Sequence, residues 1–290
     1  MTTLQLLVDG IALGAAYALV AAGFVLALNA SRAINFAHGD MVMAGGFLSV
    51  ALAAALPVSG LLLLPAVVAI MAAFGIAISA VAYFPLRARP VVSVFVSTIA
   101  VGIMLQNAAT AWFGAAPRAG PSLLGGGVIE LGGASLGRQA VAVVVIAALA
   151  YLGLHLLLGR SQLGRQLRAA AQDPAMAAAI GIDVTRMTAF AFALSAALAG
   201  AAGLLLSNSY FVTPTEGGNL MLKAYIAATI GGWGRLNGAA LGALAIGLFE
   251  TAVAAHFSAV IAEALLYAGL LVVLFVRPRG LFGERAGIRA

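Results

Sequence analysis

Long apolar runs separated by short polar segments dominate this sequence. Only 8% of the 290 residues are charged, 63% are hydrophobic and the mean hydropathy is +1.11. That balance leaves too few charges to cover a water-soluble particle of this size. A helix that crosses the hydrocarbon core of a bilayer needs about 20 mainly apolar residues, and the chain supplies this length many times. The sequence therefore predicts an all-α, polytopic transmembrane helical bundle that forms a single domain over residues 1–290.

Eight or nine membrane segments are expected, including short or broken helices. The run at 221–230 has 10 residues, too few for a full crossing, so it is a half-helix or extends into its flanks. A short segment next to glycines often lines a transport path. Residues 114–138 are glycine-rich and form a predicted loop on the outer side, with a small hairpin at 128–133. The longer runs occupy residues 4–28, 41–56, 61–84, 91–113, 139–158, 188–208, 239–255 and 260–276.

Basic residues predict the orientation, because arginine and lysine are enriched in cytoplasmic loops. With the first helix starting outside, alternation places 12 basic residues inside and only Arg118, Arg138 and Lys223 outside. We therefore expect the N-terminus outside and the C-terminus in the cytoplasm. Because the charges occupy short gaps, the net charge of +6 predicts a lipid bilayer and no nucleic acid as partner. The inner set is Arg32, Arg87, Arg89, Arg160, Arg165, Arg168, Arg186, Arg235, Arg277, Arg279, Arg285 and Arg289.

Polar side chains gather at 34–40, between the first two apolar runs. One interpretation is an ordinary turn in which Asp40 caps the following helix. The other is a broken or re-entrant element in which Asn35 and His38 satisfy freed backbone groups and help to shape a gate, since irregular backbone at membrane depth needs a cavity or protein around it. The residues predicted to line a path or gate are Asn35, Phe36, His38, Asp40, Gln106, Asn107 and Asn208.

Residues 159–187 form a polar, basic segment with helical character. Asp173 suits an N-cap, Pro174 suits the first helical position and Gly181 suits the C-terminal stop, which predicts a short helix over 174–180. Such alanine-rich helices are well suited to dock into a groove of a partner. An equally weighted alternative is an amphipathic linker that lies on anionic lipid through Arg165 and Arg168.

Isolated ionisable and small residues give weaker signals. Glu250 and Glu263 lie near span ends, where a carboxylate reaches water or pairs with His256. His155 and His256 lack the spacing of metal ligands, and we expect neither a metal site nor a cofactor. GxxxG pairs allow close helix contacts in lipid, although with 35 glycines some matches arise by chance. These pairs are Gly10 with Gly14 and Gly238 with Gly242.

Several catalytic signatures are missing from the sequence. A P-loop requires Gly-Lys followed by Ser or Thr, but the only lysine is Lys223, between Leu222 and Ala224. If ATP drives this chain, another subunit binds it. HExxH is absent, and with zero cysteines CxxC is impossible. The sequence thus predicts a non-enzymatic membrane subunit.

Three blocks resemble the inner-membrane permeases of bacterial branched-chain amino acid ABC importers of the LivH type. The resemblance extends over nearly the whole chain, and the Asn-Phe-Ala-His-Gly run beginning at Asn35 is its most specific part. The blocks are residues 14–23 with 34–40, residues 168–173 through 179–182, and residues 223–224 with 231–234 and the tail 277–283.

This resemblance implies a transmembrane permease that forms the path for branched-chain or related hydrophobic amino acids. It implies a heterodimer with a second, homologous permease subunit, two cytoplasmic ATP-binding subunits and a periplasmic substrate-binding protein. It also implies that 173–181 is the coupling helix, although Gln172 stands where the family commonly has an acid. The implied residues for coupling to the ATPase are Arg165, Arg168, Asp173, Pro174, Ala177 and Gly181.

Other functions compete with this interpretation. Urea and short-amide ABC permeases look similar, because specificity in such systems resides largely in the binding protein. A self-sufficient channel or ion-coupled carrier would use His38, Asp40 and Glu250 as titrating groups. A membrane-embedded enzyme is disfavoured by the missing catalytic signatures.

Overall fold

The structure is a computed structural model that describes residues 3–131 and 134–276. Within these residues, eight helices are long and apolar enough to cross a membrane, so the predicted all-α polytopic bundle is confirmed. Arg277, Arg279, Arg285, Arg289 and the tail 277–283 lie outside the described residues. The elements are α1 (Thr3–Ser31), α2 (His38–Ala55), α3 (Gly60–Ile78), the π-helix η1 (Ser79–Tyr83), the 3₁₀-helix η2 (Phe84–Leu86), α4 (Val91–Phe113), β1 (Val128–Leu131), β2 (Ala134–Gly137), α5 (Arg138–Arg160), α6 (Gln162–Gln172), α7 (Pro174–Ala179), α8 (Val184–Tyr210), α9 (Gly217–Gly231), α10 (Leu236–His256) and α11 (Ala259–Val276).

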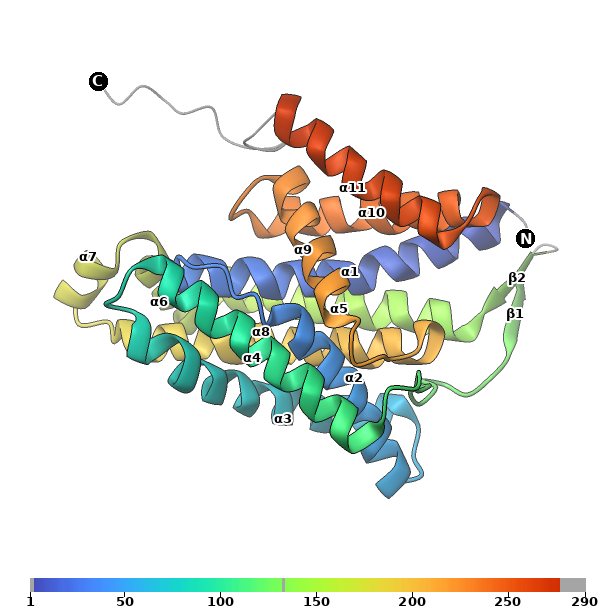
Figure 1. Cartoon of the computed structure of the whole chain (residues 1–290), viewed down its shortest axis with the longest axis horizontal. Coiled ribbons are helices and arrows are strands. Elements are labelled where there is room, and N and C mark those ends of the chain that lie inside the picture. Colours follow the sequence, from blue (N-terminus) through green and yellow to red (C-terminus); the bar gives the residue numbers. More distant parts are fainter. Residues whose placement is uncertain (1–2, 132–133, 277–290) are drawn as a thin grey trace.

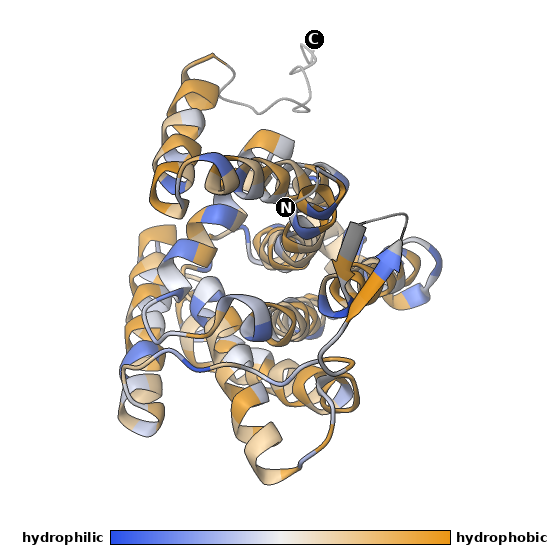
Figure 2. Cartoon of the chain, turned by 90° about the vertical axis from the view of Figure 1, so that its right-hand side faces the viewer, coloured by the Kyte–Doolittle hydropathy of each residue, from blue (hydrophilic) through white to orange (hydrophobic). Residues whose placement is uncertain are grey.

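Helices α1 and α8 form the centre of the bundle. In their most apolar stretches 89% and 83% of the residues are buried, whereas the corresponding fractions for α4 and α11 are 17% and 11%. The outer helices are mainly hydrophobic (Figure 2), and many of their large apolar side chains are exposed. A helix with an apolar surface on all sides is suited to lipid or to another membrane subunit.

The predicted glycine contacts are confirmed. A Cβ atom at Gly14 would lie 2.8 Å from Cα of Leu244, and one at Gly10 would lie 3.0 Å from Cδ2 of Leu248, so α1 and α10 approach closely at this pair. On α10, Gly238 faces the backbone of Gly231 and Gly242 faces that of Ala227. Both GxxxG pairs therefore lie in helix interfaces, where small residues allow close backbone approach.

The chain is organised as two similar halves that run in opposite directions. The first half is α1, a polar loop, α2, α3 and α4, and the second is α8, a loop, α9, α10 and α11. Each central helix packs against the third helix of the other half, α1 on α10 and α8 on α3. Helices α1 and α8 are antiparallel (Figure 1). This is the arrangement of an inverted-topology repeat, in which solute sites lie at the interface between the repeats.

Two helices begin inside the bundle rather than at its surface. Residues 32–37 turn back from the end of α1, with Ala33, Asn35 and Ala37 buried, and α2 then starts at the level of Val20. Val20 precedes the end of α1 by 11 residues, a rise of about 16 Å. Helix α9 extends the predicted 221–230 run into its flanks, but its 15 residues rise only about 22 Å. It crosses α1 at a steep angle (Figure 1).

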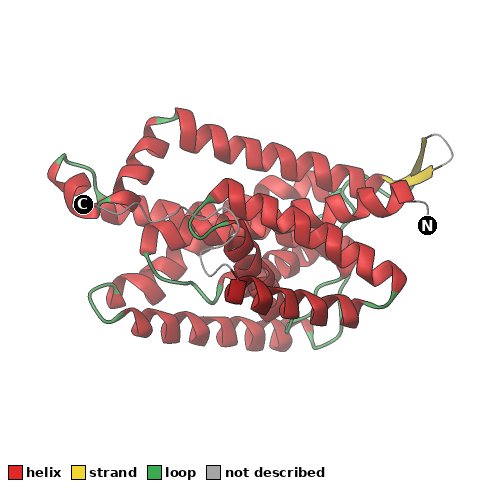
Figure 3. Ribbon diagram, turned by 90° about the horizontal axis from the view of Figure 1, so that it is seen from above, coloured by secondary structure: helices red, strands yellow, loops and turns green. Residues whose placement is uncertain are grey.

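The two ends of the bundle carry different structures. A hairpin begins at Val128 as predicted, but it extends beyond the predicted 128–133, since β2 lies at Ala134–Gly137 and Val128 is opposite Gly137 in the antiparallel pair. It lies at the end where α1 begins, and α6 and α7 lie at the opposite end (Figure 3). We call these the hairpin end and the α6–α7 end. Near the hairpin end, Arg118 and Val212 exchange two backbone hydrogen bonds, which join the 114–127 loop to the segment after α8.

We predict that Gly14→Ala destabilises the protein because the new Cβ would press on the backbone of Leu244. Overpacking of this kind costs about 1–3 kcal/mol. Gly153→Ala on α5 is the matched control, since among the described residues no atom beyond its own stretch of helix lies within 4 Å of the position that its new methyl group would take, and alanine favours helix. Thermal unfolding in detergent should give a lower Tm for Gly14→Ala only. Equal Tm values for both variants would contradict the close α1–α10 contact.

Candidate translocation site

The polar junction before α2 is fixed by hydrogen bonds at the centre of the bundle. His38 is fully buried, and its Nε2 lies 2.9 Å from the carbonyl oxygen of Val20 on α1. A carbonyl only accepts, so Nε2 donates, and Nδ1 of the neutral ring accepts from the Ser195 hydroxyl of α8 at 3.2 Å. His38 thus connects the start of α2 to both central helices.

The buried turn also satisfies its own backbone. Asn35 Oδ1 accepts a hydrogen bond from the Ala37 amide at 3.1 Å, and Thr98 Oγ1 of α4 accepts one from the Phe36 amide at 3.2 Å. The Phe36 ring packs edge to face on Phe95 of α4. Buried backbone donors need such partners, because water does not reach them. The re-entrant interpretation of 34–40 therefore agrees with the observed contacts, and its role as a gate stays a prediction.

Asp40 does not cap α2, so that alternative is wrong. The helix begins at His38, its N-cap position is Ala37 without a side-chain cap, and Asp40 lies in the first turn. Its Oδ1 instead accepts a hydrogen bond from Gln106 Nε2 of α4 at 2.9 Å. A carboxylate in the first turn is still stabilised by the helix dipole.

Asp40 sits where α2, α4 and α9 meet. A Cβ atom at Gly102 of α4 or at Gly217 of α9 would collide with its carboxylate, and one at Gly39 would collide with the carbonyl of Gly217. Only glycine permits this approach of three backbones around one acid. Two helix N-termini, those of α2 and α9, therefore converge on a buried carboxylate near the middle of the bundle.

Two of the predicted path residues lie away from this junction. Asn107 is exposed on α4 and donates to the carbonyl of Ile103 on its own helix. Asn208, near the end of α8, donates to the carbonyl of Gly120 at 3.0 Å and so holds the 114–127 loop. The structure brings together Asn35, Phe36, His38, Asp40 and Gln106.

A second buried polar cluster joins α1, α9 and α10. Lys223 Nζ lies 2.7 Å from Glu250 Oε1 and donates to the Tyr17 hydroxyl at 2.9 Å. The Lys223 side chain is only 9% exposed. Glu250 therefore pairs with Lys223. The suggested pairing of a span-end carboxylate with His256 is wrong for Glu250, because the His256 ring contacts the carbonyl of Ala252. Lys223, which was counted among the outer basic residues, lies buried within α9.

The cluster borders a cavity of about 530 Å³ that lies between α1, α5, α8 and α10. Its polar lining includes Asp9, Tyr210, Glu250 and Thr251. Glu250 Oε2 and Thr251 Oγ1 are buried without a hydrogen-bond partner among the described residues. Lys223 lies six residues after Gly217, about 9 Å along α9, so this cluster and the Asp40 junction are parts of one polar region.

The predicted short helix at the opposite end is confirmed. Asp173 Oδ1 accepts hydrogen bonds from the Ala175 and Met176 amides at 3.0 Å, and Pro174 is the first residue of α7. Gly181 has a φ of +86°, the left-handed conformation that ends a helix. Helix α7 buries Ala177, whereas Met176 and Ile180 are 63% and 69% exposed. An apolar pair at the tip of the molecule is suited to contact a partner.

Arg32 connects this end to the buried junction. Its guanidinium donates to the carbonyls of Ala171 and Gln172 at the end of α6, at 3.4 and 3.0 Å. Arg32 has a φ of +55° and begins the loop that leads to His38. Arg165 is exposed and donates to the Arg160 carbonyl, and Arg168 lines a cavity beside α6. The end of α6 and the start of the re-entrant loop are thus directly linked.

Sequence reasoning missed Thr98, Ser195 and Arg32 as partners of these elements. Hydroxyl residues are common in membrane helices, so no pattern marks Thr98 or Ser195. The Lys223–Glu250 pair had a usable signal, because an intramembrane lysine and an intramembrane acid are expected to pair.

The fold and the site together define a polytopic membrane transport subunit with discontinuous helices at its centre. The chain matches the family described as "Branched-chain amino acid transport system / permease component" over residues 6–275. It belongs to this family of permease components, as its sequence blocks indicated.

Curated relatives agree with the family. The chain is 35% identical to the high-affinity branched-chain amino acid transport system permease protein LivH of Escherichia coli K12, covering 97% of this chain and 96% of the relative. It is 34% identical to BraD of Pseudomonas aeruginosa, with the same coverage. Among solved structures it resembles PsaBC from Streptococcus pneumoniae in complex with Fab, at 16% identity and a TM-score of 0.53, covering 96% of this chain and 93% of that chain, which shows a shared fold.

We predict that Lys223→Met lowers the free energy of unfolding by about 3–5 kcal/mol, because it leaves Glu250 buried without its cation. The double variant Lys223→Met/Glu250→Met should recover most of this loss. Arg186→Met is the control, since its ion pair with Asp183 is 84% and 49% exposed and contributes at most about 1 kcal/mol. Denaturation in detergent measures the free energy of unfolding of the single, double and control variants. Additive losses in the double variant would argue against a coupled pair.

Proposed function

We propose that this chain is the membrane-spanning subunit of an ABC importer and forms part of the path for branched-chain amino acids. The observation that carries the proposal is the convergence of α2 and α9 on buried Asp40, together with the Arg32 link to α6. The names of the relatives support the substrate class. The path residues in this proposal are Asn35, Phe36, His38, Asp40 and Gln106, with Asn107 and Asn208 along its flanks.

The proposed assembly contains a second homologous permease, two cytoplasmic ATP-binding subunits and a periplasmic substrate-binding protein. The sequence has no P-loop, so in this proposal the other subunits bind the ATP. The family of permease components supports partners of this general kind.

In the proposed orientation the hairpin end faces the periplasm and the α6–α7 end faces the cytoplasm, with the protein in the bacterial inner membrane. Arg160, Arg165, Arg168 and Arg186 support this assignment, because they cluster at the α6–α7 end. Residues 114–138 are then the periplasmic loop, and residues 159–187 are the cytoplasmic coupling segment.

The proposed mechanism is alternating access driven by the ATP-binding subunits. Their closure would press on the exposed Met176 and Ile180 of α7 and displace α6. Because Arg32 holds the last carbonyls of α6, that displacement would pull on the loop that positions α2. A movement of this kind shifts the population between inward- and outward-open states.

Reconstitution tests the subunit assignment. The chain in liposomes with its second permease, ATP-binding subunits and binding protein should accumulate leucine or valine when ATP is supplied, and the chain alone should not. Urea tested in parallel separates the short-amide alternative. Uptake by the chain alone under an ion gradient would instead establish the ion-coupled carrier.

Arg32→Gln tests the mechanical link. We expect ATP hydrolysis by the full complex to continue while uptake per ATP falls about two- to tenfold, since the Arg32 bonds are exposed, a hydrogen bond of this kind contributes about 0.5–1.5 kcal/mol and about 1.4 kcal/mol corresponds to tenfold. Arg186→Gln is the control, because its guanidinium pairs with Asp183 of its own helix start, where both side chains are exposed. Unchanged coupling in Arg32→Gln would disprove this route.

A further inference from the structure

The two discontinuous helices are entered through loops of the same form. Loop 32–37 leads from α1 to α2 and loop 211–216 leads from α8 to α9, so the two loops have equal length. Each begins with a residue in the left-handed region, with a φ of +55° at Arg32 and +58° at Phe211. In the described part of the chain these are the only non-glycine residues with a positive φ, an uncommon conformation. The residue before each helix also has nearly the same φ, −72° in one loop and −73° in the other, so the inverted repeat extends to these loops.

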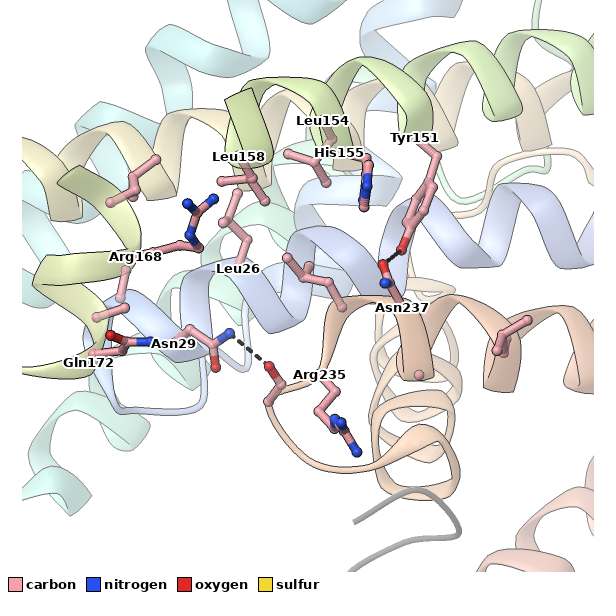
Figure 4. Close-up of a pocket in the computed structure, with 18 residues that line it drawn as sticks. Leu26, Asn29, Tyr151, Leu154, His155, Leu158, Arg168, Gln172, Arg235 and Asn237 are labelled. Atoms are coloured by element: carbon pink, nitrogen blue, oxygen red, sulfur yellow. Dashed lines mark hydrogen bonds between the residues drawn. The ribbon is translucent and has the colours of Figure 1, made fainter. Parts of the chain in front are cut away.

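An asparagine lies one turn before the end of each central helix and ties that end to a distant glycine. Asn29 Nδ2 of α1 donates to the carbonyl of Gly234, in the turn before α10, at 2.9 Å (Figure 4). Asn208 Nδ2 of α8 donates to the carbonyl of Gly120 at 3.0 Å. Each asparagine is followed three positions later by the residue with positive φ. The two ends of the bundle are therefore built on one plan, and a contact at one end has a counterpart at the other.

Different elements hold the two loops. Helix α6 holds the first loop through Arg32, and α6 leads to α7, on which the ATP-binding subunits act in the proposed function. The second loop is held by residues 114–123, which follow α4 and which we call the strap. Arg118 of the strap exchanges two backbone hydrogen bonds with Val212, at 2.9 and 2.8 Å. At the hairpin end the strap thus takes the position that α6 takes at the opposite end.

The strap is bonded to helix ends on one side and is open on the other. The Gly120 amide donates to the carbonyl of Ser207 on α8 at 2.9 Å. Leu123 is fully buried, and its amide donates to Gln139 Oε1 of α5 at 2.9 Å. Residues 114–119, by contrast, are all exposed. A partner that contacts this exposed stretch would press on elements that are bonded directly to the end of α8.

A short segment leads from the strap to the buried junction. Val212 is 6% exposed and packs on α2, since a Cβ atom at Gly46 would lie 2.7 Å from Val212 Cγ2. Pro214 is buried in the same segment, where its ring restricts the backbone. Helix α9 then begins at Gly217, which lies against the carboxylate of Asp40. A displacement of the strap therefore reaches the start of α9 without passing through a long or mobile connection.

We propose that residues 114–119 receive the substrate-binding protein and that the strap passes this contact through Val212 to α9. The inference rests on the proposed function, which places the hairpin end in the periplasm with the binding protein. The exposed stretch is apolar apart from Arg118, which fits a partner surface that carries acidic side chains. The Asp40 junction then receives two inputs, one from the ATP-binding subunits through α6 and α2, and one from the binding protein through the strap and α9.

Cross-linking tests the contact, and the chain suits this test because it contains no cysteine. The complex is assembled with cysteine-free partner subunits, and Ala116→Cys carries a photoactivatable maleimide. We expect it to cross-link to the leucine-loaded binding protein. Ala178→Cys, exposed on α7, is the control and should cross-link to an ATP-binding subunit instead. Cross-linking of the binding protein to Ile129→Cys in the hairpin, with none to Ala116→Cys, would overturn the proposal.

ATP hydrolysis by the full complex tests the transmission. In Gly120→Ala the new Cβ atom would collide with the Ser207 side chain and displace the strap from the end of α8. We expect basal hydrolysis to stay unchanged, while stimulation by the leucine-loaded binding protein falls about fivefold or more. Gly126→Ala is the matched control and should keep full stimulation, because beyond its chain neighbours no described atom lies within 4 Å of its new methyl group.

Arg118→Pro is a second variant, which decides the question if Gly120→Ala does not fold. It removes the amide that donates to the Val212 carbonyl, and it should lose stimulation to a similar degree. Tm values in detergent show whether each variant is folded. Full stimulation in either folded variant, beside a wild-type complex that responds, would overturn the role of the strap and leave the proposed function standing. A wild-type complex that does not respond to the loaded binding protein would contradict both.

Discussion

Every polar backbone group that enters a membrane away from a helix must find a partner inside the protein, and this requirement shapes the centre of the molecule. The loop 32–37 can lie at membrane depth because Asn35 and Thr98 accept from its amides. His38 then anchors α2 to α1 and α8 through its two ring nitrogens. With these contacts in place, α2 can begin in mid-bundle and bring Asp40 to the start of α9.

Close backbone contact is the second condition for this arrangement. In lipid there is no hydrophobic driving force between helices, so van der Waals packing and interhelical hydrogen bonds must hold them together. Glycines at the α1–α10 interface and around Asp40 remove the side chains that would otherwise separate the backbones. The short helices α2 and α9 pack on α8 and α10, and polar contacts with His38 and Asp40 fix the points at which the two helices begin.

Much of the fold was predictable, because the length of an apolar run and the residues that begin or end a helix are both properties of contiguous sequence. Residues 91–113 match α4 without change, and Asp173, Pro174 and Gly181 place α7 by local chemistry alone. The Asp40 cap failed because an acid in the first turn and an acid at the cap look alike in sequence. Only Gln106, 66 positions away, distinguishes them. The partners of Lys223 are also distant along the chain, so the sequence indicates that a buried lysine needs a partner but does not identify Tyr17 and Glu250.

The arrangement of ionisable groups also bears on the source of energy. An ion-coupled carrier needs acids or histidines that exchange protons or cations with water during the cycle. Here both nitrogens of His38 are engaged by Val20 and Ser195, and one oxygen of Glu250 is held by Lys223. Asp40 is enclosed by three backbones and bonded to Gln106. Fixed contacts of this kind agree with the proposed movement imposed from outside the chain through α6, α7 and Arg32.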